Sequence, residues 1–207
     1  MNINNQIPSP FYLVKKFLSK IKNGVVLDIG SGNGRNSFFL AQNNFRVEAL
    51  DINTQNVKNL KILSKQLNLN IKTKQLDVKK FKFQPRKYDL ILAIQSLIWM
   101  KKTEFIKIIK KIKDSLKPEG IAIISGFTIE DMSYLNLKSA RSPRGKNTFY
   151  SKSEKRYWQF LDKQELKKCF DGDFKILYYK EKLIREKGHD ELSKYHYHGI
   201  AEIVAKK

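Results

Sequence analysis

The sequence predicts an α/β protein with a largely parallel sheet. Short apolar runs typical of buried strands alternate with amphipathic helical segments, and a glycine-rich turn joins the first such run directly to a helix. The chain has 207 residues and is 41% hydrophobic, so we expect residues 1–207 to form a single domain with a sizeable core. No apolar run approaches the roughly 20 residues that a membrane-spanning helix needs, so we expect no membrane partner.

The first elements lie in residues 1–34. A helix is expected within residues 1–23, with Ser9 as its capping residue and Pro10 at its first position. Residues 25–29, VVLDI, are typical of a buried strand, and three glycines at alternate positions come after it in residues 30–34. A strand that turns sharply into a helix needs backbone without Cβ, and the turn leaves the first N–H groups of the helix unpaired.

A second predicted strand, residues 45–51, ends at Asp51, about 20 residues after this turn. That spacing places a carboxylate at the tip of the next strand, within reach of a pair of ribose hydroxyls. The third glycine, Gly34, stands one place earlier than in the dinucleotide pattern G-x-G-x-x-G, so a pyrophosphate cofactor fits poorly. The pattern favours a nucleoside-containing cofactor over a purely structural strand–helix turn.

The remaining elements continue the alternation. Residues 54–67 predict an amphipathic helix, residues 71–78 a strand that carries Asp77 near its end, and residues 88–94 a central buried strand. A Pro-Gly turn at residues 116–120, LKPEG, is expected to end a helix. Residues 121–125 predict a further buried strand.

The short G-x-G-x-G turn after an acidic strand, the acids at Asp51 and Asp77 and the LKPEG turn resemble class I S-adenosylmethionine-dependent methyltransferases. The segments 34–37, 160–166 and 198–206 resemble the small tellurite-resistance and thiopurine-type branch. The resemblance covers essentially the whole chain. It implies a Rossmann-like, doubly wound sheet of seven strands, mostly parallel with an antiparallel last strand, and S-adenosylmethionine as the cofactor.

The resemblance also implies roles for individual residues in holding the cofactor. Asp51 would hold the ribose hydroxyls, and Asp77 with the Val78 N–H would hold the adenine. The glycines would shape the turn around the methionine part, while Arg35 contacts the carboxylate or only caps the turn. The complete predicted set is Asp28, Gly30, Ser31, Gly32, Gly34, Arg35, Asp51, Ile52, Asp77, Val78, Ala93 and Ile94.

The residues just after the predicted strand 88–94 constrain the methyl acceptor. The Asn/Asp-Pro-Pro-aromatic motif of exocyclic-amino methylases and the Pro-Cys nucleophile of cytosine-C5 enzymes are both missing there. Gln95 and Trp99 are candidates for the acceptor pocket, although Trp99 fits ordinary packing equally well. A soft nucleophile such as a thiolate needs no general base. We therefore expect a small-molecule acceptor: a thiol, a chalcogen oxyanion or another small nucleophile.

Three histidines stand close together late in the chain: His189, His196 and His198. His196 and His198 alternate on a predicted strand over residues 195–205 and share one face. No Cys or acidic residue has typical ligand spacing from them, so no metal site is predicted. The branch resemblance places a polar residue near this edge in the acceptor pocket, which makes His198 the catalytic candidate. A solvent-facing pair on an edge strand is the alternative.

The formal net charge of +21 raises the question of a nucleic-acid partner. Only 7 of the 41 basic residues are Arg, and the lysines are dispersed. This favours a codon bias toward Lys, rather than a nucleic-acid partner, as the source of the charge. Cations are more concentrated between Lys138 and Arg156, inside a long segment, residues 127–160, that we interpret as a substrate lid with Arg141 as a substrate contact. A basic excursion without a specific partner is the alternative for this segment. The alternatives are a tRNA or rRNA methyltransferase and a non-catalytic cofactor-binding protein on the same fold.

The single cysteine, Cys169, cannot form an internal disulfide and fits a core thiol. The polar, uncharged start of the chain shows no signal peptide. We therefore expect a reducing, cytoplasmic location. The sequence gives no indication of the oligomeric state.

Overall fold

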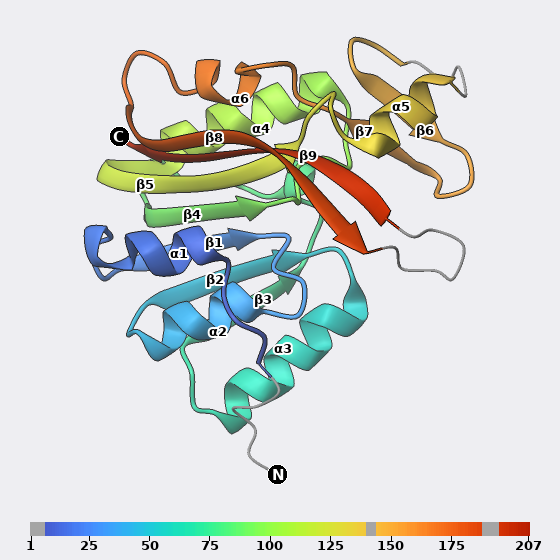
Figure 1. Cartoon of the computed structure of the whole chain (residues 1–207). Helices are drawn as coiled ribbons and strands as arrows, with labels where there is room; N and C mark the ends of the chain where they lie inside the picture. Colours follow the sequence, from blue (N-terminus) through green and yellow to red (C-terminus); the bar gives the residue numbers. More distant parts are fainter. Residues whose placement is uncertain (1–6, 140–143, 188–194) are drawn as a thin grey trace. The chain divides into compact units, whose positions relative to one another are not determined.

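A computed structural model describes residues 7–139, 144–187 and 195–207. Within these residues the main sheet has seven strands in the order β3-β2-β1-β4-β5-β9-β8, and β6 and β7 form a separate antiparallel pair. β1 pairs in parallel with β2 and β4, and β2 in parallel with β3. The predicted sheet, mostly parallel with an antiparallel last strand, is confirmed (Figure 1).

The described elements have the following bounds: α1 Tyr12–Phe17, η2 Leu18–Lys20, β1 Val25–Ile29, α2 Arg35–Gln42, β2 Arg46–Asp51, α3 Thr54–Gln66, β3 Ile71–Gln75, η3 Val78–Lys80, β4 Tyr88–Ile94, α4 Lys102–Ser115, β5 Leu116–Phe127, α5 Met132–Ser139, β6 Thr148–Ser151, β7 Arg156–Gln159, α6 Glu165–Lys168, β8 Lys175–Lys187 and β9 Tyr195–Lys206.

The chain divides into two compact units. The first, here called the N-terminal unit, comprises Met1–Ala93, Lys110–Ile123 and Lys206–Lys207. The second, the C-terminal unit, comprises Ile94–Ile109 and Ile124–Ala205. The boundaries fall inside β4, α4, β5 and β9. The expectation of a single domain over residues 1–207 stays a prediction.

The N-terminal unit is organised around β1, whose Val26 and Leu27 are fully buried. Hydrogen bonds at its start tie it to β4, because the Asp89 carboxylate accepts from the Val25 N–H at 2.8 Å and pairs with Lys117 at 2.7 Å. A Cβ at Gly24 would clash with that carboxylate and displace it from the Val25 N–H. At the other end of β1 the chain turns directly into α2 (Figure 1).

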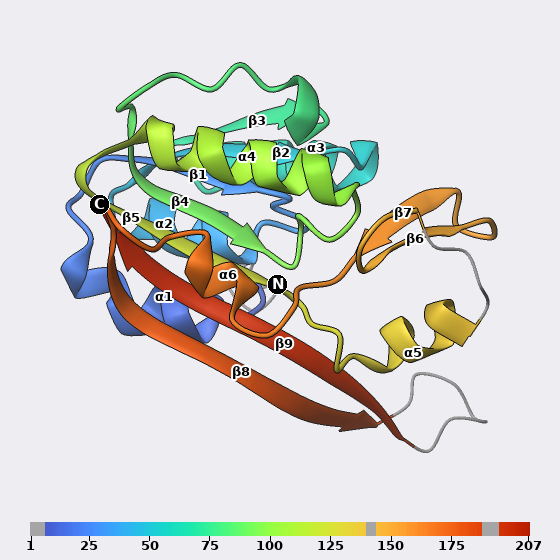
Figure 2. The ribbon, with the colours of Figure 1, turned by 90° about the horizontal axis from the view of Figure 1, so that it is seen from above.

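In the C-terminal unit, β8 and β9 run side by side as a long ribbon of opposed strands, and α5 lies beside the β6–β7 hairpin (Figure 2). A cluster of buried apolar side chains anchors this unit: Ile98, Phe127, Phe149, Phe160 and Ile200. The long segment interpreted as a lid thus contains α5, β6 and β7. Among the described residues, no helix combines the length and apolarity that crossing a bilayer requires.

Three details of the predicted elements are wrong. Ser9 does not cap the first helix, which begins at Tyr12 after Phe11, whose own N–H donates to Asn36 Oδ1 at 2.8 Å. The strand predicted over residues 71–78 ends at Gln75. Residues 116–120 belong to β5 rather than to a turn, because their backbone pairs with Lys207: the Glu119 N–H donates to the Lys207 carbonyl at 3.0 Å, and the Lys207 N–H donates to the Gly120 carbonyl at 2.9 Å.

Candidate functional site

The glycine turn between β1 and α2 is held against the tip of β2. The N–H groups of Gly30 and Ser31 both donate to the Leu50 carbonyl, at 2.8 and 2.9 Å. Gly30, Gly32 and Gly34 have φ values of 69°, 53° and 82°, in the left-handed region that favours glycine. The three glycines therefore allow a left-handed backbone conformation in which other residues would be strained.

Two of these glycines differ in what surrounds them. A Cβ at Gly34 would clash with Leu60 of α3 and lie 3.1 Å from Phe38, so Gly34 lets α2 and α3 pack closely. A Cβ at Gly32 would meet no atom within 4 Å. Packing thus accounts for Gly34, whereas the open space at Gly32 is available to a ligand.

Asp51 lies next to that open space. Its Oδ2 accepts from the Gly32 N–H at 2.7 Å, and its Oδ1 accepts from the Asn53 N–H at 2.8 Å. A carboxylate has about four acceptor positions, so each oxygen can accept a further hydrogen bond. The neighbouring Ile52 is 70% exposed, and the buried Ser31 hydroxyl has no hydrogen-bond partner among the described residues. The site therefore combines a fixed acid, an apolar surface and an unsatisfied hydroxyl, which fits a nucleoside-containing ligand.

Asp28 lies at the end of β1 and is 2% exposed. Burial raises the pKa of its carboxyl to about 6, with a smaller contribution from the charge of Asp51. The Ser37 hydroxyl, which donates to Asp28 at 2.6 Å, and the positive charge of Arg35 act in the opposite direction on this pKa. The carboxyl group thus links the end of β1 to α2 inside the protein.

Asp77 and Ala93 complete the predicted residues of the N-terminal unit. Asp77 caps η3, accepting from the Lys79 N–H at 2.9 Å, and its carboxylate lies 3.3 Å from the Lys79 ammonium. Ala93, near the end of β4, is fully buried, and Val78 is 9% exposed. The structure therefore brings the glycine turn and Asp51 into direct contact, whereas Asp77 bonds locally, at the start of η3.

His198 lies in the C-terminal unit and forms a dyad with Asp131. Its Nδ1 is 2.9 Å from Asp131 Oδ2, and Asp131 is fully buried. The other oxygen of Asp131 accepts from the Ser133 N–H at 2.8 Å, which fixes the carboxylate. Phe127 stacks on the imidazole with ring centroids 5.2 Å apart and planes 9° apart. The ring of His198 is therefore fixed on two sides.

Gly199 makes this dyad possible. A Cβ at Gly199 would lie 2.5 Å from Thr128 Oγ1 and 2.7 Å from the Asp131 nitrogen. Without it, the turn at residues 128–131 lies directly against β9, and the Thr128 N–H donates to the Gly199 carbonyl at 2.8 Å. Asp131 was missed in the sequence because it lies far from His198 along the chain. The local signal was the glycine after His198, which indicates that another segment approaches the strand closely there.

The two other predicted acceptor residues of this unit have definite surroundings. Gln95 comes directly after β4 with a φ of 51°, and its N–H donates to the Ser125 carbonyl and hydroxyl. Trp99 packs edge-on against Trp158, and the Arg156 guanidinium lies 3.5 Å from the Trp99 ring centroid. Packing therefore accounts for much of the Trp99 environment, while Gln95 holds a strained backbone conformation of the kind found at functional sites.

Two predicted residues fall outside the described part of the chain, and one alternative stays open. Arg141 and His189 lie outside the residues that the structure describes. β9 lies between β5 and β8 in the sheet, but His196 and His198 come before Gly199, whose carbonyl accepts from Thr128 just past the end of β5, so the alternative of a solvent-facing histidine pair on an edge strand stays a prediction. The side chains of His196 and His198 are 12% and 23% exposed.

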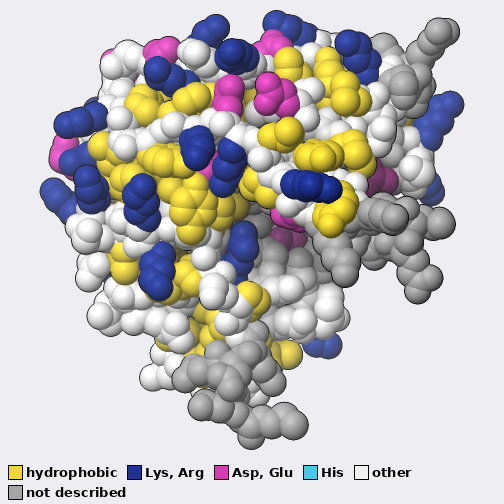
Figure 3. Space-filling model, viewed as in Figure 1, with side chains coloured by type: hydrophobic (Ala, Val, Ile, Leu, Met, Phe, Trp, Pro, Cys, Tyr) yellow, Lys and Arg dark blue, Asp and Glu magenta, His cyan; other side chains and the backbone are white. Residues whose placement is uncertain are grey.

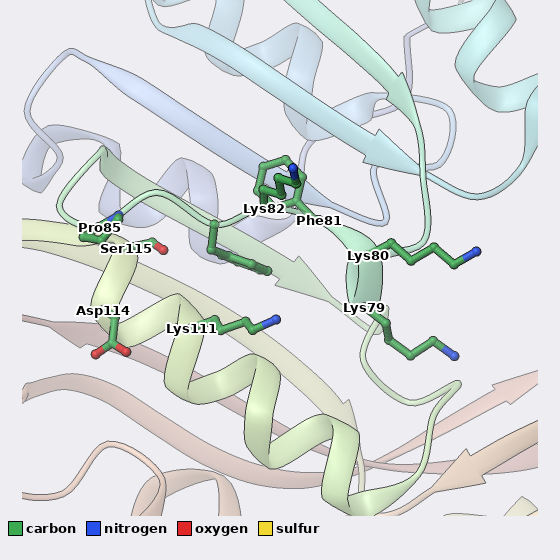
Figure 4. A pocket seen from close by; sticks show the side chains of 9 residues that line it. Lys79, Lys80, Phe81, Lys82, Pro85, Lys111, Asp114 and Ser115 are labelled. Atoms are coloured by element: carbon green, nitrogen blue, oxygen red, sulfur yellow. The ribbon is translucent and has the colours of Figure 1, made fainter.

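Basic side chains are spread over the visible face of the molecule among other side chains (Figure 3). One pocket of the N-terminal unit is lined largely by lysines and phenylalanines, with Lys111 reaching in from α4 (Figure 4). The ammonium groups of Lys111 and Lys74 lie 5.8 and 5.5 Å from the rings of Phe83 and Phe81. These lysines cover aromatic surface, a packing role that requires no polyanion.

The fold is that of the class I methyltransferases. The crystal structure of TehB from Haemophilus influenzae superposes with a TM-score of 0.76 at 23% identity, over 96% of this chain and 62% of that chain. The 1,6-didemethyltoxoflavin-N1-methyltransferase of Burkholderia thailandensis, solved with 1,6-didemethyltoxoflavin and S-adenosylhomocysteine bound, gives a TM-score of 0.66 at 17% identity, over 95% and 75% of the two chains.

The family model for tellurite resistance protein TehB matches residues 11–191, and the chain belongs to this family. Among curated relatives, malonyl-[acyl-carrier protein] O-methyltransferase 2 of Ilyobacter polytropus is 30% identical over 169 residues, which are 79% of this chain and 60% of that protein. A probable S-adenosyl-L-methionine-dependent methyltransferase TehB of Haemophilus influenzae is 30% identical over 99 residues, 48% of this chain and 34% of that protein. The chain thus spans less than two thirds of either relative. The predicted family resemblance is confirmed.

Proposed function

We propose that the protein is an S-adenosylmethionine-dependent methyltransferase whose acceptor is a small nucleophile, such as a thiol or a chalcogen oxyanion. The observation that carries the proposal is the open space at Gly32 beside the fixed carboxylate of Asp51. Membership of the TehB family and the methyltransferase names of the relatives support it.

S-adenosylmethionine supplies a methyl group already activated by its sulfonium sulfur. Asp51 would accept hydrogen bonds from the ribose hydroxyls, and the backbone at Gly32 would lie against the methionine part. Asp77 with the Val78 N–H would hold the adenine, and Ile52 offers exposed apolar surface to its flat face. The remaining proposed contacts are Asp28, Gly30, Ser31, Gly34, Arg35, Ala93 and Ile94.

His198 is the proposed catalytic residue on the acceptor side. Because a carboxylate accepts from an N–H, the contact with Asp131 places the proton on Nδ1 and leaves a lone pair on Nε2. In this neutral form Nε2 would take the proton of a protonated nucleophile, whereas an anionic nucleophile would be oriented by the Nε2–H of the protonated ring. Asp131 is then a positioning residue, while Gln95, Trp99 and Arg141 are the proposed substrate contacts.

The test is methyl transfer from S-adenosylmethionine carrying a labelled methyl group, with separate thiols, tellurite, selenite and total RNA as acceptors. We expect label in a small-molecule product. Label in RNA alone would replace this proposal by an RNA methyltransferase, and tight cofactor binding without transfer to any acceptor would favour a non-catalytic protein.

Variants of the dyad test the acceptor side. His198→Ala should lower kcat while leaving cofactor affinity unchanged. Asp131→Asn should shift the pH profile of kcat, which a merely structural role would not move.

A further inference from the structure

We infer that Glu186, His196 and His198 form a binding site for a divalent transition-metal ion, with a donor set that suits zinc. Their ligand atoms all lie within 4.8 Å of one another. An ion at this site would hold an anionic methyl acceptor. This catalytic use of the ion rests on the proposed function. All three residues belong to the C-terminal unit.

The two neighbouring strands β8 and β9 bring these side chains to one face of their ribbon. His196 and His198 alternate along β9 and so point the same way, and Glu186 joins them from β8 with its Oε2 3.8 Å from His196 Nε2. Arg185, one residue earlier, instead stacks its guanidinium 3.7 Å from the Tyr195 ring, as expected for the opposite face. The cluster therefore follows from strand alternation.

The spacing is close to what a metal needs. Zinc bonds of 2.0–2.1 Å in a tetrahedron place ligand atoms roughly 3.4 Å apart. The 3.8 Å pair is nearly at that distance, and a separation of 4.8 Å would have to shorten by roughly 1.4 Å through side-chain rotation on binding. The two imidazoles lie beside each other without stacking, their centroids 4.7 Å apart and their planes at 78°.

Asp131 supplies the outer partner that metal-binding histidines usually have. Histidine ligands commonly donate their second ring N–H to a carboxylate, which orients the ring and makes the coordinating nitrogen more basic. Here the buried Asp131 contacts His198 Nδ1 at 2.9 Å, so Nε2 is the nitrogen available to an ion. The stacked ring of Phe127 holds the same imidazole from its face.

The donor set selects the kind of ion. Two imidazoles and one carboxylate suit zinc and its first-row neighbours, whereas magnesium and calcium prefer oxygen ligands alone. Three protein ligands leave a fourth position open, as in catalytic zinc sites. A thiolate or oxyanion acceptor would occupy that position, and His198 would then be a ligand rather than a free base.

The sequence interpretation predicted no metal because no acid stands at ligand spacing from the histidines. Glu186 was not found in this way because it lies on β8, whereas the two histidines lie on β9. Spacing along the chain detects ligands on one helix or turn. A ligand contributed by a paired strand becomes visible only through the pairing.

The experiment titrates zinc chloride into the untagged full chain after treatment with a chelator, with binding followed by calorimetry. We expect one zinc ion per chain, and a loss of affinity of at least tenfold for His196→Ala and for Glu186→Gln. Asp131→Asn should weaken binding by roughly tenfold or more. Matched controls are Tyr197→Ala, at the alternate position of the same strand, and Glu119→Gln, another surface carboxylate; both should bind zinc as the wild type does.

Cobalt substitution gives a second readout, because a tetrahedral cobalt site with nitrogen ligands has a visible absorption band that His196→Ala should abolish. Circular dichroism checks that each variant is folded. Absence of zinc binding, or wild-type affinity in folded His196→Ala and Glu186→Gln, would overturn the metal site. Cofactor affinity and methyl transfer are measured in parallel: transfer without zinc binding removes only the metal site, and zinc binding without cofactor binding removes the proposed function.

Discussion

Asp51→Ala removes a carboxylate that the N–H groups of Gly32 and Asn53 hold at 2.7 and 2.8 Å. In the proposed complex the same carboxylate accepts two bonds from ribose hydroxyls, each worth about 1.5–3 kcal/mol because the acceptor is charged. One lost bond at the lower value reduces affinity at least tenfold, and the loss of both reduces it about a hundredfold. The fold should remain intact, since Asp51 lies at the tip of β2.

The assay is calorimetric titration with S-adenosylmethionine, accompanied by thermal unfolding. Asp89→Asn is the matched control: Asp89 also accepts a backbone N–H, from Val25 at 2.8 Å, but at the start of the strands rather than at their carboxyl ends. It should lower the melting temperature and leave cofactor affinity unchanged. Unchanged affinity in folded Asp51→Ala would refute the assignment of the ribose site.

The glycine turn, the buried Asp28 and the dispersed lysines each make a further prediction. Gly32→Val should abolish cofactor binding at a stability cost of about 1–2 kcal/mol for its left-handed backbone, whereas Gly34→Val, which clashes with Leu60, should chiefly lower stability in thermal melts; retained affinity in Gly32→Val would make the turn purely structural. Burial holds the Asp28 pKa at about 6, above its usual 3.8, so ionisation costs the folded state roughly 3 kcal/mol. That cost is absent below about pH 4, grows up to about pH 6 and is fully present above it, so Asp28→Asn should be more stable relative to the wild type at pH 8 than at pH 4; a stability difference that does not change with pH would contradict this. RNA binding should be weak and lost at about 150 mM salt, because few phosphate contacts are expected. A sub-micromolar, sequence- or structure-selective complex at that salt, lost on neutralising Arg141, Arg144 and Lys146, would favour the RNA alternative.

The features that the sequence predicted well are those determined by neighbouring residues. The course from β1 through the glycines into α2 follows from a buried apolar run and from backbone that only glycine adopts without strain. The position of Asp51 follows from strand length and parallel pairing. The details that were wrong depend on distant partners: Asn36 takes the Phe11 N–H, and the backbone of Lys207 extends β5 back to Leu116.

The partners of His198 were not predicted from the sequence, for the same reason. His198 was selected because the family resemblance places a polar residue near this edge, but Asp131 and Glu186 reach it from a turn and a neighbouring strand. Gly199 is the physical link, because its missing Cβ admits the turn that carries Asp131. Long-range packing of this kind has no signature in local periodicity.

Titration of the purified chain with S-adenosylmethionine and, separately, with NAD tests the central claim most directly. The short glycine turn, the open space at Gly32 and the fixed Asp51 carboxylate predict one molecule of S-adenosylmethionine bound per chain and much weaker binding of the dinucleotide. Tighter binding of NAD, or no binding of S-adenosylmethionine to the folded protein, would contradict the account.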